Sequence, residues 1–184
     1  MEHAERLLAA ASELFYRRGV RAVGMDDVRA ASGVSLKRLY QCFPSKEALV
    51  VAYLERRDER WLSALTGYVA EHEGSVEAVF AWLERWFAED DFRGCGFVNA
   101  HSELGATSET VRDVVRRHKQ RLRDHLRGLA EAAGARDPGV LAEQLLALVD
   151  GATVTAMVDP GRATAAARAA GQAARALVTA ACRG

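Results

Sequence analysis

Apolar residues recur every three or four positions along almost the whole chain, which is the spacing of amphipathic helices. In the first segment Leu7, Ala11 and Phe15 follow this spacing. Gly19 then stands where a helix commonly ends in the left-handed conformation. Strand patterns are nearly absent, since the chain has few β-branched runs and almost no strict alternation of apolar and polar residues. The sequence therefore predicts an all-α fold.

Start and stop signals divide this periodic pattern into about nine helices. Ser or Asp precedes most of the segments, and their side-chain oxygens can accept the unpaired N–H groups of a first turn. Two starts combine Asp with Pro, which has no N–H group to leave unpaired, at Asp137 and Asp159. The expected helices cover residues 3–18, 25–31, 36–41, 46–69, 76–89, 95–104, 109–133, 138–158 and 160–182.

Composition and motifs restrict the possible functions. Hydrophobic residues make up 49% of the chain and charged residues 27%, as in folded globular proteins. No nucleophile elbow, phosphate-binding loop, zinc-protease helix or dinucleotide fingerprint occurs, so we expect neither an enzyme nor a cofactor. The cysteines, Cys42, Cys95 and Cys182, are too far apart for a paired zinc site, so we expect no metal. An acidic start and the lack of a long uncharged apolar run favour a cytoplasmic protein without membrane contact.

Two short helices around a glycine turn form a helix-turn-helix candidate. The first covers about 25–31, and the turn contains Gly33. Ser35 can cap the second helix, which covers about 36–41. At about 100° per residue, one side of this second helix is apolar and can pack, and the opposite side is polar. The apolar side carries Leu36, Leu39 and Phe43, and the polar side carries Lys37, Arg38 and Gln41.

A polar helix side of this kind suits the DNA major groove, where Arg and Lys bond guanine and Gln bonds adenine. Tyr40 lies at its border and can reach a phosphate. Lys46 opens the next helix, where its ammonium and the unpaired N–H groups can hold another phosphate. Residues 1–46 contain eight Lys or Arg and five Asp or Glu, although the net charge of the chain is zero. The alternative is that a short polar helix face is only solvated.

A longer pattern of residue types and spacings extends over the same region. It contains Leu8-x-Ala10-Ala11-x-x-Leu14-Phe15-x-x-x-Gly19, Val28, Gly33-Val34-Ser35, Leu39-Tyr40, Phe43 and Ser45-Lys46-Glu47-Ala48-Leu49. From Leu7 to Val50 the chain thus resembles the N-terminal domain of the TetR/AcrR family of transcriptional regulators. The resemblance covers about a quarter of the chain, and it is specific because both residue types and spacings agree.

The resemblance implies a homodimer that binds a double-stranded DNA operator, usually as a repressor released by a small-molecule effector. Activators also exist, and neither the effector nor the operator follows from the sequence. The implied division is a helix-turn-helix DNA-binding domain over 1–46 and a ligand-binding and dimerisation domain over 47–184. Carried over by position, base or phosphate contacts are implied for Ser35, Lys37, Arg38, Tyr40 and Gln41, and a phosphate contact for Lys46.

Some positions depart from the family pattern. Gly24 stands where Ser or Thr usually caps the second helix and contacts a phosphate, so that contact is absent or made by backbone N–H alone. Lys37 and Arg38 stand where Gly and Thr are frequent, and Cys42 replaces a frequent His. The operator sequence of other members therefore cannot be transferred to this chain.

The last two helices of such regulators form the dimer interface, and the sequence is compatible with this. The helix over 138–158 has an apolar stripe, and the helix over 160–182 is rich in alanine, so helices can approach closely. The alternative is an ordinary internal core. The two stripes contain Leu141, Leu145, Leu148, Ala152 and Ala156 on the first helix and Ala163, Ala166, Ala170, Ala173, Ala174 and Leu177 on the second.

Aromatic residues gather in the middle of the chain and could line the effector pocket. Aromatic stripes at helical spacing are more often core than pocket, whereas the same helices usually enclose the ligand in this family. Glu103 is a further polar group near them, and Cys95 could be either a sensor or a small buried residue. The predicted pocket residues are Trp61, Trp82, Trp86, Phe97, Asn99 and His101.

The basic stretch 116–123 resembles a nucleic-acid patch, but apolar residues claim the inner side of its helix, so we expect a solvated, ion-paired surface. His118 and His125 are too far apart to clamp one metal ion. The helix over 46–69 joins the two halves, so movement at Trp61 would reach Lys46. The competing function is a small helical ligand-binding protein without sequence-specific DNA binding.

Overall fold

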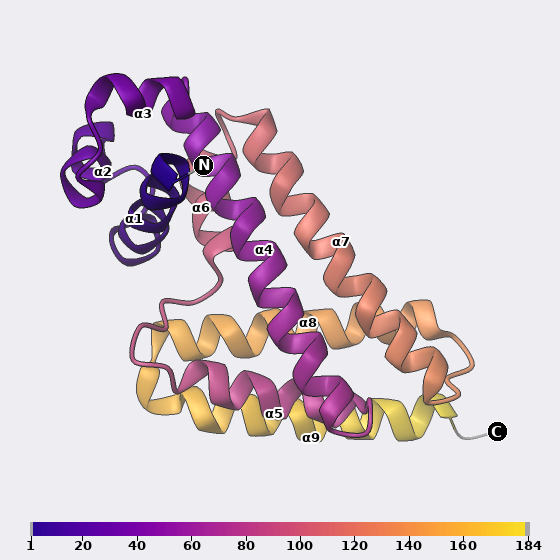
Figure 1. Ribbon diagram of the computed structural model, residues 1–184. Helices are drawn as coiled ribbons and strands as arrows, with labels where there is room; N and C mark the ends of the chain where they lie inside the picture. The colour runs from indigo at the N-terminus through magenta and orange to yellow at the C-terminus, as the bar shows by residue number, and fades with distance from the viewer. Residues whose placement is uncertain (1, 183–184) are drawn as a thin grey trace. The chain divides into compact units, whose positions relative to one another are not determined.

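The computed structural model describes residues 2–182, and these residues form nine α-helices and one short 3₁₀ turn without any strand. The all-α fold expected from the periodicity is therefore confirmed (Figure 1). The elements are α1 (Glu2–Arg18), α2 (Met25–Ser32), α3 (Leu36–Cys42), α4 (Lys46–Glu71), α5 (Val76–Phe87), α6 (Gly96–Leu104), α7 (Glu109–Ala132), α8 (Pro138–Val158), η1 (Pro160–Arg162) and α9 (Ala163–Cys182).

The helices begin close to the expected positions because their capping residues act as the sequence indicates. At the start of α5, the Ser75 side chain accepts the backbone N–H of the third residue along at 3.3 Å. Asp137 does the same at the start of α8, at 3.0 Å. The expected helix over 160–182 was wrong at its start, because residues 160–162 form the 3₁₀ turn and α9 begins at Ala163.

The chain forms two compact units, and each is assembled from two separate stretches of sequence. The first unit contains the residues up to Arg60 together with Gly96–His118. The second contains Trp61–Cys95 together with the residues from Lys119 onward. Helices α4 and α7 each contribute residues to both units. The functional boundary expected at residue 46 is a different kind of division and stays a prediction.

In the first unit, α1 packs against α2 and α3 around a small apolar core (Figure 1). Phe15, Leu39 and Tyr53 are at most 3% exposed, and the rings of Phe15 and Tyr53 meet edge to face at 5.6 Å between centroids. Burying a side chain of this size contributes roughly 1.5–3 kcal/mol. An ion pair of 2.6 Å between Arg56 and Glu5 also holds α4 to α1.

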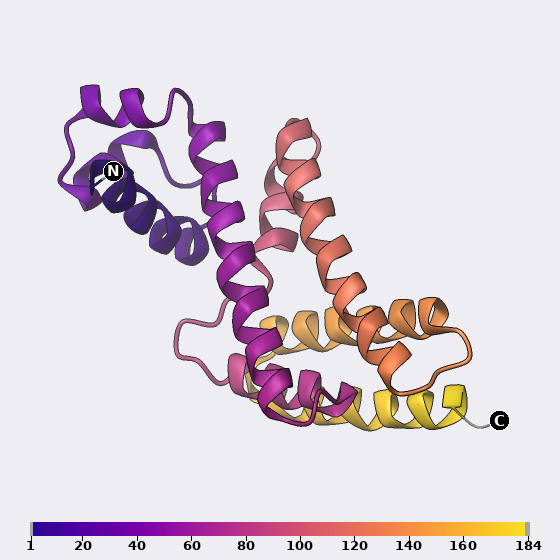
Figure 2. The same ribbon diagram turned by 45° about the vertical axis from the view of Figure 1, so that its right-hand side comes forward.

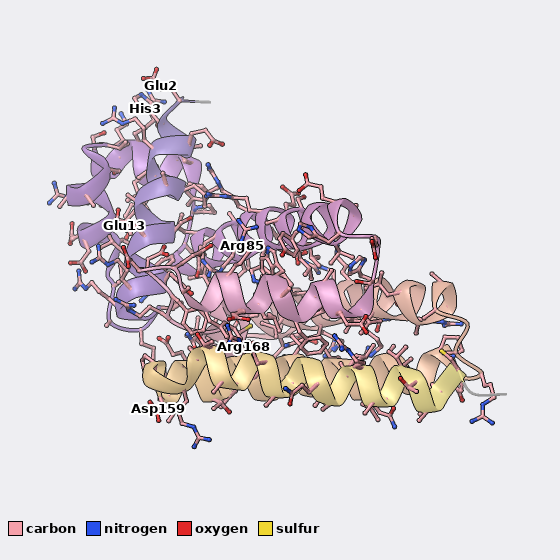
Figure 3. All side chains as sticks on the ribbon, turned by 90° about the horizontal axis from the view of Figure 1, so that it is seen from below. Glu2, His3, Glu13, Arg85, Asp159 and Arg168 are labelled. Carbon is pink, nitrogen blue, oxygen red and sulfur yellow. The ribbon has the colours of Figure 1, made fainter. Side chains whose placement is uncertain are left out.

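In the second unit, α5, α8 and α9 lie side by side (Figure 2). Gly171 permits a close approach of α9 to α5, because a Cβ atom there would lie 3.1 Å from Cβ of Phe80. Arg168 reaches from α9 toward α5 and forms an ion pair with Glu84, with 2.8 Å between Nη2 and Oε1 (Figure 3). Gly171 therefore allows the close spacing of α9 and α5, and the Arg168–Glu84 ion pair also joins these two helices.

The apolar stripe that the sequence suggested for α8 lies inside the second unit. Leu141, Leu145, Ala152 and Ala156 are at most 5% exposed and belong to the core of this unit. Packing within the chain, the alternative left open by the sequence, therefore accounts for most of that stripe. The apolar side chains that α8 leaves exposed are Val140, Val154 and Val158, at 53%, 45% and 74%.

Among the described helices, α8 alone is long and apolar enough to cross a membrane by length and composition, with a mean hydropathy of 1.4. Buried helices of globular proteins have the same properties, and the core residues of α8 pack within the second unit. The helix is therefore weak evidence for a membrane span.

Candidate nucleic-acid interface

Helix α3 has a fixed inner side and an exposed outer side. Leu39 is fully buried beneath it. Ser35 caps its first turn, because its side chain accepts the backbone N–H of Arg38 at 3.4 Å. Its backbone is extended, as is usual for an N-cap residue. The exposed side chains of α3 include all four for which DNA contacts were predicted, namely Lys37, Arg38, Tyr40 and Gln41.

The turn between α2 and α3 is held by side chains on both sides of it. Gly33 ends α2 in the left-handed region at φ 64°, where glycine has no steric cost. Nη2 of Arg6 on α1 donates to the carbonyl oxygen of Ser32 at 2.6 Å. The hydroxyl oxygen of Ser32 in turn accepts the backbone N–H of Val34 at 3.3 Å. These bonds fix the angle at which α3 leaves α2.

Leu36 does not pack as the sequence predicted. Its side chain is 41% exposed, although it was assigned to the packed side of α3 together with Leu39. Val34, just before the helix, is 4% exposed and provides the buried apolar side chain at this end of α3. Leu36 therefore adds an exposed apolar group beside Lys37 and Tyr40.

Lys46 begins α4 and is partly buried. Its Nζ donates to the carbonyl oxygen of Arg21, in the loop between α1 and α2, at 3.4 Å. Burial lowers the pKa of this ammonium, while the negative charges of Glu103 and Asp27 oppose that shift. The ammonium predicted to hold a phosphate is thus already drawn toward the loop.

Glu103 on α6 contacts the same loop. Its Oε2 accepts the backbone N–H of Arg21 at 2.6 Å. The sequence had placed this residue near the expected ligand pocket. The signal that it would contact the loop is absent from the sequence, because 82 residues separate the two partners.

The start of α2 is stabilised by a carboxylate instead of a capping hydroxyl. Gly24 has no side chain, and its backbone N–H donates to Oδ2 of Asp27 at 2.7 Å. This bond lowers the pKa of Asp27, and the nearby Arg18 guanidinium lowers it further. The sequence left open whether the phosphate contact at Gly24 is absent or is made by its backbone N–H, and this N–H is already bonded to Asp27.

The first turn of α4 is also bonded to the start of α7. The carboxylate of Glu47 accepts hydrogen bonds from the hydroxyls of Ser108 and Thr110, the latter at 2.7 Å. These two bonds lower the pKa of Glu47. Arg21 and Glu47, on either side of α2 and α3 in the sequence, thus both bond residues more than fifty positions further along the chain.

Three of the predicted pocket residues form an aromatic cluster in the second unit. The ring of Trp61 meets Trp82 and Trp86 edge to face, with centroids 4.9 and 5.5 Å apart. Trp86 also meets Phe92 edge to face at 5.0 Å. These contacts give the cluster the character of a packed core, and its role as a ligand pocket stays a prediction.

The other three predicted pocket residues lie on α6 in the first unit. Phe97 is 1% exposed, Asn99 is partly buried and His101 is exposed. The six residues therefore divide equally between the two units. Cys95, directly before α6, is partly exposed and is in no disulfide.

A buried histidine on α7 was missed by the sequence reasoning. His118 is 2% exposed, and its Nδ1 lies 2.7 Å from Oδ1 of Asp58 on α4. Its ring stacks on Phe97 at 3.6 Å between centroids, so it joins three helices of the first unit. We had assigned its stretch to a solvated surface, and for His118 this was wrong. The signal was available, since His118 lies four residues from both Val114 and Leu122 on the buried side of α7.

Two families of known sequences match the chain. Residues 7–53 match bacterial regulatory proteins of the tetR family, and residues 104–184 match a tetracyclin repressor-like C-terminal domain. The first match coincides with the region that contains α1, α2, α3 and the start of α4.

Solved structures of regulators superpose on the whole chain. A TetR-family transcriptional regulator from Streptomyces coelicolor is 26% identical with a TM-score of 0.90, and the match covers 100% of this chain and 98% of that one. A putative tetR transcriptional regulator from Streptomyces avermitilis is 33% identical with a TM-score of 0.80, and 98% of each chain is covered.

Curated relatives match over shorter regions. The transcriptional activator FasR of Mycolicibacterium smegmatis is 38% identical over 90 residues, which is 45% of this chain and 41% of the relative. The transcriptional repressor NemR of Escherichia coli is 28% identical over 116 residues, which is 60% of this chain and 58% of the relative. The chain therefore spans less than two thirds of the length of these relatives.

Proposed function

Since the chain is a transcriptional regulator of the TetR family, we propose that it represses its target genes by binding an operator duplex as a homodimer. A small-molecule effector then releases it from the DNA. The observation that carries this proposal is the exposed polar side of α3, whose inner side is anchored by the fully buried Leu39. A side chain that reads a base must be exposed while its helix is held in place.

On α3, Lys37 and Arg38 bond guanine bases in the major groove, and Gln41 bonds adenine. Ser35 and Tyr40 contact the flanking phosphates. The exposed Leu36 is suited to the methyl group of a thymine, because apolar side chains discriminate that base in the major groove. These contacts give the protein its sequence preference.

At the start of α4, Lys46 contributes a phosphate contact. Its Nζ can stay bonded to the carbonyl oxygen of Arg21 and still donate to an anion, because an ammonium has three donors. The positive end of the α4 helix dipole favours negative charge at the same place, and Ser45 caps this end by accepting the backbone N–H of Ala48 at 3.1 Å. This contact fixes the position of the protein on the duplex without reading its sequence.

The homodimer forms through the exposed sides of α8 and α9. On α8 the exposed apolar side chains are Val140, Val154 and Val158. On α9 an open groove of about 420 Å³ is lined by two alanines together with longer polar and charged side chains, and a second helix can approach closely at the alanines. Two copies related by a two-fold axis present two α3 helices to successive major grooves. The groove residues are Gln172, Arg175, Ala176, Thr179 and Ala180.

The effector binds among the aromatic side chains of Trp61, Trp82 and Trp86 in the second unit. Phe97, Asn99 and His101, in the first unit, are separate candidates for effector contacts. Its binding favours a state whose two α3 helices no longer match the operator, so differential affinity for the two states drives release. The continuous helix α4 carries the change toward Lys46. The family resemblance favours repression, and the names of the relatives include both an activator and a repressor.

In this proposal, residues 1–46 provide the DNA-binding domain, and residues 47–184 provide dimerisation and effector binding. The protein acts in the cytoplasm, where the DNA is. This division is one of function and not of compact structure, because the hydrogen bond between Arg21 and Glu103 joins residues from both sides of it within the first unit.

The experiment that tests the proposal is selection of genomic fragments from the source organism with the purified protein. We expect enrichment of a two-fold symmetric sequence, and binding of a matched duplex by two copies of the chain. Genes beside the enriched fragments then suggest the chemical class of the effector. A monomeric protein that binds selected and random duplexes equally at moderate salt would contradict the proposal.

A further inference from the structure

The backbone of Arg21, in the loop between α1 and α2, is held on both sides by charged side chains. Its N–H donates to Oε2 of Glu103 on α6 at 2.6 Å. Its carbonyl oxygen accepts a hydrogen bond from Nζ of Lys46 on α4 at 3.4 Å. A short loop is thus fixed by groups from two helices that are distant in the sequence.

The structure assigns Glu103 as a positioning residue for DNA binding: its carboxylate holds the loop that places α2 and Lys46. The inference rests on the proposed DNA-binding function. Glu103 lies outside the helix-turn-helix segment and acts through Arg21 rather than on the DNA itself.

The approach of Glu103 to the loop is close enough to need a glycine. Gly19 has φ 85°, and a Cβ atom there would lie 3.0 Å from Oε1 and 3.3 Å from Oε2 of Glu103. A side chain at position 19 would therefore press on the carboxylate as well as strain the backbone. The end of α1 is shaped to receive this carboxylate.

The held loop leads directly into α2. Three residues after Arg21, the backbone N–H of Gly24 is bonded to Asp27 at 2.7 Å. The loop that enters α2 is therefore fixed by Glu103 from α6, by Lys46 from α4 and by Asp27 from α2 itself. Removing the Glu103 bond leaves the longer Lys46 bond and the local Asp27 bond, so the loop and the Lys46 ammonium gain freedom that specific binding must remove.

The electrostatic environment supports the same arrangement. Glu103 and Asp27 oppose the lowering of the Lys46 pKa by burial. Their negative charges therefore keep a cation in place at the start of α4, next to the loop. The Glu103 carboxylate and the Lys46 ammonium stabilise the same geometry, in which both the N–H and the carbonyl oxygen of Arg21 are hydrogen-bonded.

The test compares Glu103→Ala, which removes the acceptor, with Glu103→Gln, whose amide oxygen can still accept the Arg21 N–H. The matched control is Glu59→Ala, because Glu59 is an exposed carboxylate in the same unit with no ion pair among the described residues. It removes the same charge without touching the loop.

The probes are a duplex selected by the wild-type protein and a scrambled duplex of the same composition. We expect Glu103→Ala to weaken binding of the selected duplex about fivefold relative to Glu59→Ala, as the loss of one net hydrogen bond implies. Binding of the scrambled duplex should be equal in the two variants, and Glu103→Gln should retain most of the wild-type affinity. The salt dependence should keep its slope, because Glu103 neutralises no phosphate.

Amide hydrogen exchange of Arg21 in the full chain provides a second readout that needs no DNA. Exchange should be faster in Glu103→Ala and close to wild type in Glu103→Gln. Equal exchange of the Arg21 amide in all variants would overturn the inference. Tighter binding of the selected duplex by both Glu103 variants would also overturn it, because Glu103 would then act by repelling the DNA. A wild-type protein that prefers neither duplex would refute the proposed function, and the positioning role with it.

Discussion

At the scale of single residues, the cations of the interface differ in how they are held. Lys37 is exposed on α3, whereas Lys46 is partly buried and bonded to the backbone of Arg21. The exposed side chain of Lys37 can extend to a base edge in the groove. The ammonium of Lys46 is held at the start of α4 and can contact only a phosphate next to that helix start.

Lys37→Ala should therefore change which base is preferred at one operator position, with a loss of about 1–3 kcal/mol for the best sequence. Lys46→Ala should weaken all duplexes about equally and reduce the slope of the salt dependence by about one. Anisotropy titrations with the selected duplex and its single-base variants, at several salt concentrations, measure both effects. If the two variants showed the same profile over the base variants, the assignment of separate roles would be wrong.

His125 should make stability fall with acidity. Its Nε2 is buried without a hydrogen bond in the described structure, and burial lowers the pKa of the ring. Because the folded pKa is lower than the unfolded value of about 6.5, the unfolded state binds the proton first as the pH falls. The loss of stability from this residue begins below about pH 6.5 and ends at the folded pKa.

His125→Phe should remove this contribution. Urea unfolding at a series of pH values between about 7.5 and 5 would then show a flatter decline of stability for the variant than for the wild type. Parallel curves for the two proteins would mean that the ring is protonated equally easily in both states.

Among the residues, exposure on α3 could be predicted from the sequence, and partnerships across the chain could not. The polar side of α3 follows from helical geometry alone, so Lys37, Arg38 and Gln41 were placed correctly on an exposed side. The contact of Glu103 with the loop was not predicted, because its partner is 82 residues away and no local pattern encodes such a contact. His118 was assigned to the surface together with the basic residues around it, although its spacing from Val114 and Leu122 puts it on the buried side of α7.

At the scale of elements, the turn between α2 and α3 should be sensitive to a single methyl group. Gly33→Ala forces a side chain into the left-handed region at φ 64°, and its Cβ would lie 3.0 Å from Nη2 of Arg6. We expect a loss of roughly 1 kcal/mol in unfolding free energy. Operator binding should fall as well, since the Arg6 bond to the turn must shift.

Gly67→Ala is the matched control, because Gly67 lies exposed within α4 and a Cβ there meets nothing within 4 Å. It should increase the unfolding free energy by roughly 0.5–1 kcal/mol, through the higher helix propensity of alanine. Urea denaturation of the two variants measures both changes. Equal effects would show that the backbone conformation at position 33 costs nothing.

Helix positions were predictable because their ends depend on local chemistry. Ser75 and Asp137 cap α5 and α8 as their residue types indicate, so most bounds agree within two residues. The end of α4 at Glu71 was less clear, because the left-handed residues Glu73 and Gly74 follow it rather than a single capping glycine. The 3₁₀ turn after α8 could not be predicted, because Asp followed by Pro can start either an α-helix or a 3₁₀ turn.

At the scale of the whole molecule, self-association should depend on the exposed side of α8. Val154 is 45% exposed on this helix, and the proposed interface brings it to a second copy. Val154→Glu would bury a charge without a partner there, so we expect a monomer at micromolar concentration. Operator affinity should fall by at least about tenfold, because the second half-site no longer adds to the first.

Light scattering after gel filtration gives the mass, and Ala106→Glu serves as the control, since Ala106 is exposed in the first unit and far along the chain from α8. It should remain dimeric and bind normally. A Val154→Glu protein that keeps twice the chain mass would place the interface elsewhere.

The division into compact units could not be predicted from the sequence. A compositional change near residue 46 is local, whereas the first unit joins residues up to Arg60 with Gly96–His118 through contacts such as Glu47 with Thr110. Such contacts close long loops, and their energetic benefit appears only when both ends are in place. Helical periodicity describes each segment without saying which segments meet.

The discontinuous make-up of the first unit has a consequence for protein engineering. A hybrid regulator that takes only residues 1–46 from this chain leaves behind the carboxylate that holds Arg21 and the hydroxyls that hold the start of α4. A graft that carries residues 1–60 together with Gly96–His118 keeps both sets of bonds with their partners. The transplantable module is therefore discontinuous in the gene. During synthesis, Gly96–His118 leaves the ribosome only after Trp61–Cys95, a stretch that belongs to the other unit.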